Sequence, residues 1–229
     1  MSEDALSGLY PFLHGRRQDP AALEAALVES VRQKSAHHLR VIETFFARNA
    51  EAVVACARTL AEVFRGGGRL FAMGNGGSAC DAAHVAVEFL HPITAGRPAL
   101  TAVDLSCDRT MITAVANDVG YEHVFARQLI AQARPGDALI GLSTSGNSPN
   151  LVRAFREAKR LGLKTIGLAG HTGGEMARLG LDHCLVVETD SIHRVQEAHV
   201  TIYHILWDLV HTLLADHRRG GDAAAGERS

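Results

Sequence analysis

The chain has 229 residues, of which 47% are hydrophobic and 21% are charged, and 23 basic against 25 acidic residues give a net charge of -2. This balance excludes a strong basic field, so we expect neither nucleic acid nor an acidic membrane as a partner. No apolar run reaches the roughly 20 residues of a membrane span, and the 4 cysteines form no Cys-x-x-Cys pair. We therefore expect a cytoplasmic protein with reduced thiols and one α/β domain.

The first third of the chain precedes the α/β pattern. Residues 1–20 mix glycine, proline and arginine without a steady period, which predicts a flexible arm. Residues 21–66 repeat apolar side chains at three- and four-residue steps, which predicts a long helix or a helical hairpin as an N-terminal extension. Water cannot satisfy this apolar stripe, so it packs on its own domain or on another copy of the chain. The pattern supports both.

A glycine-rich turn follows the first expected strand. Residues 69–73 form a short apolar run, typical of a strand buried on both faces. The turn Gly74–Ser78 then offers flexible backbone and a hydroxyl before the helix expected at 79–90, which is where open α/β sheets bind ligands. The glycine spacing is G-x-G-G and not G-x-G-x-x-G, and no acidic residue follows a second strand, so a nicotinamide cofactor is the weaker alternative.

Strand and helix patterns alternate over the rest of an α/β domain that we expect at residues 67–217. Further strands are expected at 99–104, 138–142, 164–169 and 182–188. Helices are expected at 108–115, from a polar turn at Asn117–Gly120 through 132, at 150–161, shortly after Gly174 and at 191–217. This order predicts a doubly wound parallel sheet of five strands flanked by helices on both faces. The Gly- and Ala-rich end, residues 218–229, is predicted to be disordered.

The densest polar turn is Leu139–Asn150, between a strand and a helix. Pro149 suits the first helical position, where its missing N–H costs nothing. Four hydroxyl side chains lie within six positions: Ser143, Thr144, Ser145 and Ser148. Backbone N–H groups at a helix N-terminus together with hydroxyl donors suit a phosphate monoester. A simple helix cap is the alternative, but a cap uses only one such side chain.

Two of the expected helices, at 79–90 and 191–217, carry acid/base side chains. His84 and Glu88 lie one turn apart on one helix face. Gln196 and His204 are eight residues apart, about 12 Å along a straight helix, so both cannot easily contact one small ligand. A lone helical histidine is more often a hydrogen-bonded core residue, an interpretation that we keep for two others: His199 and His211. Beside two phosphate-type turns, however, a carboxylate and an imidazole form an acid/base pair.

Five motifs occur in one register between residues 21 and 215: Gly74-Asn-Gly-Gly-Ser78, Asp81-Ala-Ala-His-Val-Ala-Val-Glu88, Ala116-Asn-Asp118, Ser143-Thr-Ser-Gly-Asn-Ser148, and Arg194-Val-Gln-Glu-Ala-His199 followed by His204. Each motif is weak alone, but five in order are specific. Together they resemble the sugar isomerase (SIS) domain family and, within it, the phosphoheptose isomerases. Those enzymes convert D-sedoheptulose 7-phosphate to D-glycero-D-manno-heptose 7-phosphate through an enediol, in nucleotide-activated heptose biosynthesis.

The resemblance implies a set of site residues. The phosphate would be bound by Ser78, Ser143, Thr144, Ser145 and Ser148. The sugar would be bound by Asn75, Gly76, Gly77, Glu88, Asn117, Asp118 and Gln196. Glu88 would be the general base and His204 its partner acid. One zinc ion per subunit, catalytic or structural, would be held by His84, Glu88, Gln196 and His204. The resemblance also implies a homotetramer with sites at subunit boundaries, so different subunits would supply Gln196 and His204.

One segment departs from the family pattern. The segment Leu90–Pro98 is shorter than the usual Gly-Arg-Tyr or Gly-Arg-Phe continuation and carries only Arg97, which leaves the identity of the sugar open. The alternative function is a non-catalytic SIS protein for sugar-phosphate binding or assembly, because a relative that assists replication initiation shares the serine loops. That relative usually lacks a glutamate at the position of Glu88, so this glutamate favours an enzyme.

Overall fold

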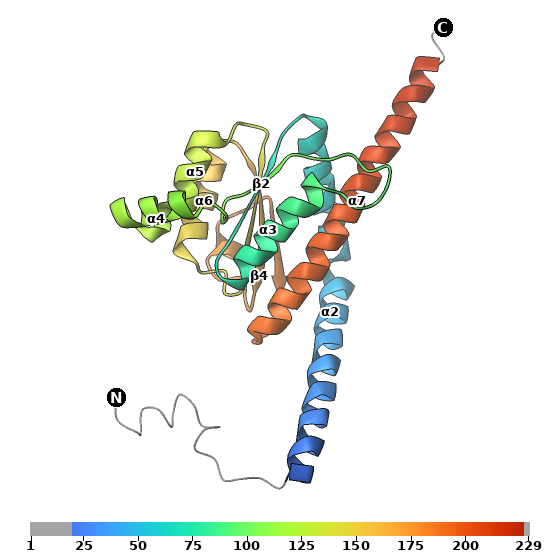
Figure 1. The fold of residues 1–229 in the computed structure, drawn as a ribbon. Helices are drawn as coiled ribbons and strands as arrows, with labels where there is room; N and C mark the ends of the chain where they lie inside the picture. Colours follow the sequence, from blue (N-terminus) through green and yellow to red (C-terminus); the bar gives the residue numbers. More distant parts are fainter. Residues whose placement is uncertain (1–19, 227–229) are drawn as a thin grey trace. The chain divides into compact units, whose positions relative to one another are not determined.

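The computed structural model describes residues 20–226, and the side chains of α7 up to residue 215 (Figure 1). The flexible arm expected at residues 1–20 lies almost entirely outside this range. Contacts divide the chain into two units, Met1–Arg40 and Val41–Ser229. Helix α2, Pro20–Arg65, is one continuous helix and not a hairpin. In the first unit its apolar side chains are exposed, with Leu27 at 54% and Val31 at 68%.

The second unit is built on a parallel sheet, as the alternation predicts. Its strands are β1 Leu70–Gly74, β2 Ala102–Asp104, β3 Ala138–Ser143, β4 Lys164–Gly170 and β5 His183–Val187. Their order is β2-β1-β3-β4-β5. Leu70 pairs with both Ala102 and Ala138, and Ala138 pairs with Lys164, so these strands start in line and end at one edge. The direction of winding reverses between β1 and β3, and a switch point of this kind is where such sheets bind ligands.

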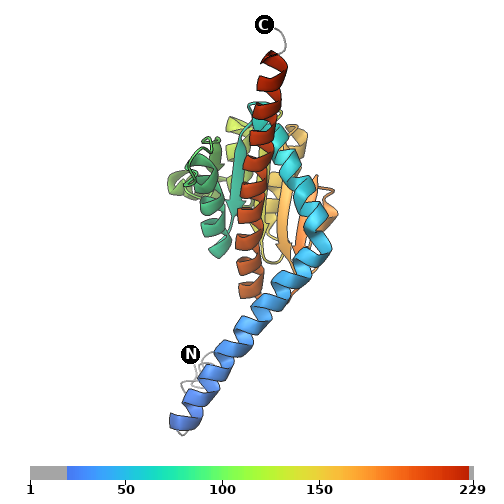
Figure 2. The ribbon, with the colours of Figure 1, turned by 90° about the vertical axis from the view of Figure 1, so that its right-hand side faces the viewer.

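Helices cover both faces of the sheet (Figure 1). The remaining elements are α3 Gly77–Leu90, α4 Arg109–Asp118, η2 Tyr121–His123, α5 Val124–Gln132, α6 Pro149–Arg160, η3 Met176–Arg178 and α7 Ile192–Gly226. One core cluster joins α3, α7 and the later part of α2 to side chains such as Leu70, and the other joins α4, α5 and α6 to side chains such as Phe71. Successive residues of one strand thus serve opposite cores because strand side chains alternate between faces. In Figure 2, the red α7 lies beside the cyan part of α2.

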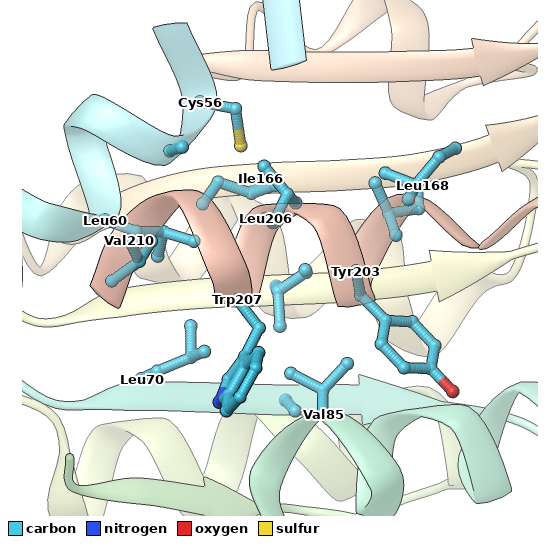
Figure 3. Packing of buried hydrophobic residues seen from close by; sticks show 14 of the residues in the cluster. Cys56, Leu60, Leu70, Val85, Ile166, Leu168, Tyr203, Leu206, Trp207 and Val210 are labelled. Atoms are coloured by element: carbon cyan, nitrogen blue, oxygen red, sulfur yellow. The ribbon is translucent and has the colours of Figure 1, made fainter. Parts of the chain in front are cut away.

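The later part of α2 belongs to the α/β core. Cys56 and Leu60 are fully buried against Ile166 and Leu206 in the cluster that Figure 3 draws. Burial raises the pKa of the Cys56 thiol to about 12, which keeps the thiol protonated and unreactive, as expected for a core cysteine. The N-terminal extension is therefore not a separate layer over its whole length, because residues from Val41 onward complete the sheet's hydrophobic face.

Several boundaries differ from those expected. Asn117 and Asp118 are the last two residues of helix α4 and not, as we had expected, part of a polar turn. Gly120, with φ of 107°, separates α4 from η2. A glycine with positive φ stops the helix because other residues adopt that backbone conformation at a cost. Helix α7 continues to Gly226, past the end expected near residue 217, so residues 218–226 are helical although we expected them to be disordered. Within residues 20–226, no helix has both the length and the apolarity that crossing a bilayer requires.

Candidate active site

The serine turn is held in a compact loop between β3 and α6. Its tightest point is Gly146, with φ of 66°, where a Cβ atom would lie 2.1 Å from the backbone oxygen of Gly173. The backbone N–H of Gly146 donates to the Ser143 hydroxyl at 3.1 Å, and that of Asn147 donates to the Ser145 hydroxyl at 3.2 Å. The loop therefore needs glycine at position 146, both for its backbone conformation and for close approach to the 173 loop.

Ser148 does not act as a simple helix cap. It occupies the N-cap position of α6, yet its side chain makes no capping hydrogen bond. Its hydroxyl lies 3.2 Å from that of Ser143 instead. Pro149 stands at the first helical position, as expected. Hydroxyl groups that pair with one another at a helix N-terminus can turn to an anion without uncapping the helix.

A reciprocal pair of amides joins the serine turn to the glycine turn. Asn75 Nδ2 donates to Asn150 Oδ1, and Asn150 Nδ2 donates to Asn75 Oδ1, each at 2.9 Å. The Tyr121 hydroxyl also donates to Asn75 Oδ1 at 3.0 Å, and the backbone N–H of Leu151 donates to Asn150 Oδ1 at 3.1 Å. Asn150 is 2% exposed. The two turns therefore form one rigid edge above β1 and β3.

Helices α3 and α7 bring the acid/base side chains together. His84 Nε2 lies 3.1 Å from Glu88 Oε1, and the His84 and His204 rings are 5.0 Å apart. Ligand atoms of all three residues lie within 4.8 Å of one another. Two imidazole nitrogens and a carboxylate oxygen are a donor set that zinc accepts. Among the histidine, cysteine and acidic side chains that the structure describes, this is the group suited to a metal ion.

The contacts between α3 and α7 follow the same order along both helices, so the helices run side by side in one direction (Figure 1). Near their starts, a Cβ atom on Gly77 would lie 2.2 Å from Gln196 Nε2. One chain thus brings His204 to His84 and Glu88, whereas its Gln196 lies at the glycine turn. The separation of Gln196 and His204 along one helix is as expected, and His204 needs no second subunit to join this cluster.

The electrostatics of the cluster favour a neutral His204. Burial, and next the neighbouring His84, lower the pKa of His204, while Glu88 opposes the shift. Burial raises the pKa of the nearby Asp81 carboxyl to about 6, and the charge of His84 partly offsets this. Asp81 Oδ2 is buried without a hydrogen-bond partner. A neutral imidazole can donate one proton and offer one lone pair, as acid/base transfer and metal binding both require.

Asn117 and Asp118 stand apart from this arrangement. Both are exposed at the end of α4, where Asn117 Nδ2 donates to Asp118 Oδ1 at 2.8 Å. Among residues 20–226, no hydrogen bond joins either side chain to the serine turn or to the glycine turn. Their assignment to the sugar site stays a prediction.

Sequence reasoning did not single out the residues that brace the cluster. The indole Nε1 of Trp207 donates to the backbone oxygen of Glu88 at 2.7 Å. Arg97, from the segment that departs from the family pattern, lies 4.3 Å above the Trp207 ring and also donates to Asp208. Trp207 is one turn beyond His204, so helical spacing places it on the face toward α3, but only the fold identifies its partner.

Comparison with known proteins shows the family of the chain. The family model for the SIS domain matches residues 35–170, and the chain belongs to this family. Within the SIS family, the chain belongs to the phosphoheptose isomerases. The phosphoheptose isomerase of Chlorobaculum parvum is 44% identical over 189 residues, covering 81% of this chain and 90% of the relative. That of Geotalea daltonii is 40% identical over 193 residues, covering 84% and 100%.

Solved structures of the same family share the fold. The phosphoheptose isomerase from Neisseria gonorrhoeae has a TM-score of 0.77 and 34% identity, covering 81% of this chain and 99% of that one. The enzyme from Francisella tularensis has a TM-score of 0.78 and 30% identity, covering 81% and 98%. These matches span nearly the whole length of both relatives.

Proposed function

We propose that the protein is an aldose–ketose isomerase that converts D-sedoheptulose 7-phosphate to D-glycero-D-manno-heptose 7-phosphate. The observation that carries the proposal is the position of Glu88 beside two imidazoles, in a chain whose relatives are named phosphoheptose isomerases. A carboxylate next to imidazoles can act as the general base and general acid that move a proton between neighbouring carbons. A protein that only binds a sugar phosphate has no need of this cluster.

In the proposed reaction, Glu88 removes a proton from C1 of the ketose, beside the C2 carbonyl. The electrons of the broken C–H bond form the C1–C2 double bond of an enediol, and the carbonyl oxygen takes up a proton. The proton held by Glu88 then returns to C2, while the oxygen on C1 loses its proton and becomes the aldehyde. His204, held neutral by burial, moves the proton between the two oxygens. Well-placed proton transfer of this kind contributes about 10²–10⁴-fold to the rate.

The two turns hold the substrate in this proposal. Hydroxyl groups and helix N-termini bind the phosphate: Ser78, Ser143, Thr144, Ser145 and Ser148. Polar groups of the glycine turn, of the end of α4 and of α7 bind the sugar: Asn75, Gly76, Gly77, Asn117, Asp118 and Gln196. The compact serine turn and the amide pair support this assignment, because they fix the donors before substrate arrives. The double variant Ser145→Ala/Ser148→Ala should raise KM far more than it lowers kcat, since each lost bond to a charged group is worth about 1.5–3 kcal/mol.

A zinc ion completes the proposal, held by His84, Glu88 and His204, with Gln196 as the fourth ligand expected from the family resemblance. The donor set within 4.8 Å supports the first three, while Gln196 of the same chain lies at the glycine turn, about 12 Å along α7 from His204, so the Gln196 of another subunit would have to supply the fourth ligand. When bound, zinc would stabilise negative charge on the substrate oxygens as a Lewis acid. Elemental analysis of protein purified without chelators tests this, and His84→Ala should lose the metal. Protein without zinc would remove the metal from the proposal.

We also propose a homotetramer with shared sites. Exposed apolar side chains on residues 20–40 support self-association. Ser78 and Glu88 are ten residues apart in α3, about 15 Å along the helix axis, which is long for one small substrate. A shared site brings the turns of one subunit to the Glu88 of another. At substrate concentrations far below the KM of the serine double variant, co-assembled Ser145→Ala/Ser148→Ala and Glu88→Gln subunits should then recover activity that each variant lacks alone. No recovery in mixed tetramers would place each site within one chain.

The function is tested by turnover. Purified protein is incubated with sedoheptulose 7-phosphate, with the unphosphorylated ketose and with a shorter ketose phosphate, and the aldose formed is quantified. The proposal expects conversion of the heptulose phosphate, far slower conversion of the free sugar, and a preference that reflects chain length. Tight binding of sedoheptulose 7-phosphate without aldose formation would instead identify a sugar-phosphate-binding protein and refute the enzyme.

A further inference from the structure

A buried tyrosine contacts the histidine of the cluster. Tyr203 is 2% exposed and belongs to the same hydrophobic cluster as Val85 and Leu206. Figure 3 shows its ring reaching from α7 toward α3, with the hydroxyl at its far end. That hydroxyl oxygen lies 2.7 Å from His84 Nδ1, and the two rings are 5.4 Å apart at 76°. Packing therefore fixes a hydroxyl against one defined nitrogen.

The partners of His84 determine which nitrogen carries the proton. The other ring nitrogen, Nε2, lies 3.1 Å from Glu88 Oε1. An ionised carboxylate only accepts hydrogen bonds, so Nε2 carries a proton and donates to Glu88. In a neutral imidazole Nδ1 then has the free lone pair, and the Tyr203 hydroxyl must be the donor to it. The hydrogen bonds run in one direction, from Tyr203 through His84 to Glu88.

The same hydroxyl can serve the opposite tautomer. To act as a metal ligand beside Glu88 and His204, His84 must present the lone pair of Nε2, and its proton then resides on Nδ1. A ring N–H on the far side of a metal-binding histidine usually donates to a fixed partner that orients the ring. The Tyr203 oxygen accepts this bond from the position it already holds. A hydroxyl can reverse its role without moving, because it both donates and accepts.

We propose that Tyr203 is a positioning residue that holds the His84 ring with Nε2 toward Glu88 and His204: its hydroxyl donates to Nδ1 in the metal-free protein and accepts from Nδ1–H when Nε2 binds a metal ion. A phenylalanine would fill the same space, so the hydroxyl is the atom that carries this role. The effect on catalysis rests on the proposed function, whereas the effects on the Nδ1 hydrogen bond and on metal affinity do not. The residue acts through His84 and needs no contact with substrate.

The test compares Tyr203→Phe with Tyr121→Phe in the full-length protein. Tyr121→Phe is the matched control because it removes a hydroxyl that bonds to Asn75, away from the histidine cluster. Solid-state ¹⁵N spectra of the metal-free protein, with the His84 signals identified from His84→Gln, report the tautomer. We expect all three proteins to hold the Nε2–H form, because Glu88 accepts its bond, and only Tyr203→Phe to shift the Nδ1 signal, because that nitrogen loses the bond from the hydroxyl. Zinc affinity, measured with the metal alone, should fall about 10–100-fold only in Tyr203→Phe.

Steady-state kinetics of Tyr203→Phe are the third measurement, after the ¹⁵N spectra and the zinc affinity. Tyr203→Phe should lower kcat about 10–100-fold with KM nearly unchanged, since the hydroxyl supports the acid/base cluster and not the phosphate turn. Unchanged ¹⁵N signals and zinc affinity in folded Tyr203→Phe would overturn the inference, even if activity fell. If Tyr203→Phe does not fold, an Nδ1–H tautomer in metal-free wild type would overturn it instead. Wild-type protein that shows these tautomer and zinc results but no turnover would refute the proposed function alone.

Discussion

The amide pair between the two turns gives a quantitative prediction. Asn150→Ala removes two inter-turn bonds of 2.9 Å to Asn75 and the 3.1 Å bond from the backbone of Leu151. Each such bond contributes about 0.5–1.5 kcal/mol net, so three bonds amount to roughly 1.5–4.5 kcal/mol. Asn75 retains its bond from Tyr121, which places the expected loss nearer the lower value. The same change frees the glycine turn from the serine turn, so KM for the sugar phosphate should rise.

The assay is urea unfolding at fixed protein concentration, together with steady-state kinetics. Asn49→Ala is the matched control, because Asn49 makes one 2.9 Å bond to the Phe45 backbone within α2. Asn49→Ala should lower the free energy of unfolding by about 1 kcal/mol and leave KM unchanged. The reasoning is refuted if Asn150→Ala destabilises no more than Asn49→Ala and leaves KM unchanged. A large stability loss with a normal KM would show that the pair supports the fold but not the site.

Three further predictions concern other parts of the α/β unit. Burial lowers the pKa of His199 to about 4, from 6.5; the unfolded chain therefore binds the extra proton between these values, and up to about 3 kcal/mol of stability is lost as pH falls from 6.5 toward 4. His199→Leu should flatten this part of the stability profile in denaturation at pH 7.5 and 4.5, and an unchanged slope would contradict it. Arg97→Lys keeps the charge but loses the planar stack on the α7 indole, so thermal unfolding should register a loss of about 0.5–2 kcal/mol; full stability would mean that this contact contributes nothing. Gly146→Ala meets both a positive φ and a backbone oxygen, whereas Gly136→Ala meets only a φ of 92°; the first should therefore destabilise the protein more and raise KM, and equal effects would refute the close-packing argument.

The sequence predicted the sheet and the positions of the glycine turn and the serine turn because both depend on local patterns. Alternating apolar runs and helical periods are enough for a five-stranded parallel sheet, and clustered hydroxyls are visible without a structure. The Asn75–Asn150 pair was not predicted, since nothing local indicates that two turns far apart in sequence meet at one edge. It follows only from the neighbouring positions of β1 and β3.

The histidine cluster was predicted as residues but not as an arrangement. Helix rise alone correctly separated Gln196 from His204, but it could not show which residue each one meets. The parallel run of α3 beside α7 answers this, because it sets Gln196 at Gly77 and His204 at His84. Tyr203 was not singled out for the same reason: on the sequence it belongs to an apolar stripe, and its hydroxyl gains a role only from its neighbour on α3.

The most direct test of the account is the isomerisation rate of Glu88→Gln, measured as aldose formed from sedoheptulose 7-phosphate. The amide keeps the shape of the side chain but cannot accept the proton, so the rate should fall at least about 100-fold, while inorganic phosphate binds as in wild type. Glu51→Gln, an exposed glutamate on α2, is the matched control and should retain the full rate. A Glu88→Gln enzyme that keeps more than roughly a tenth of the wild-type rate, a loss of less than about 1.4 kcal/mol in transition-state stabilisation, would contradict the role of Glu88 as the base.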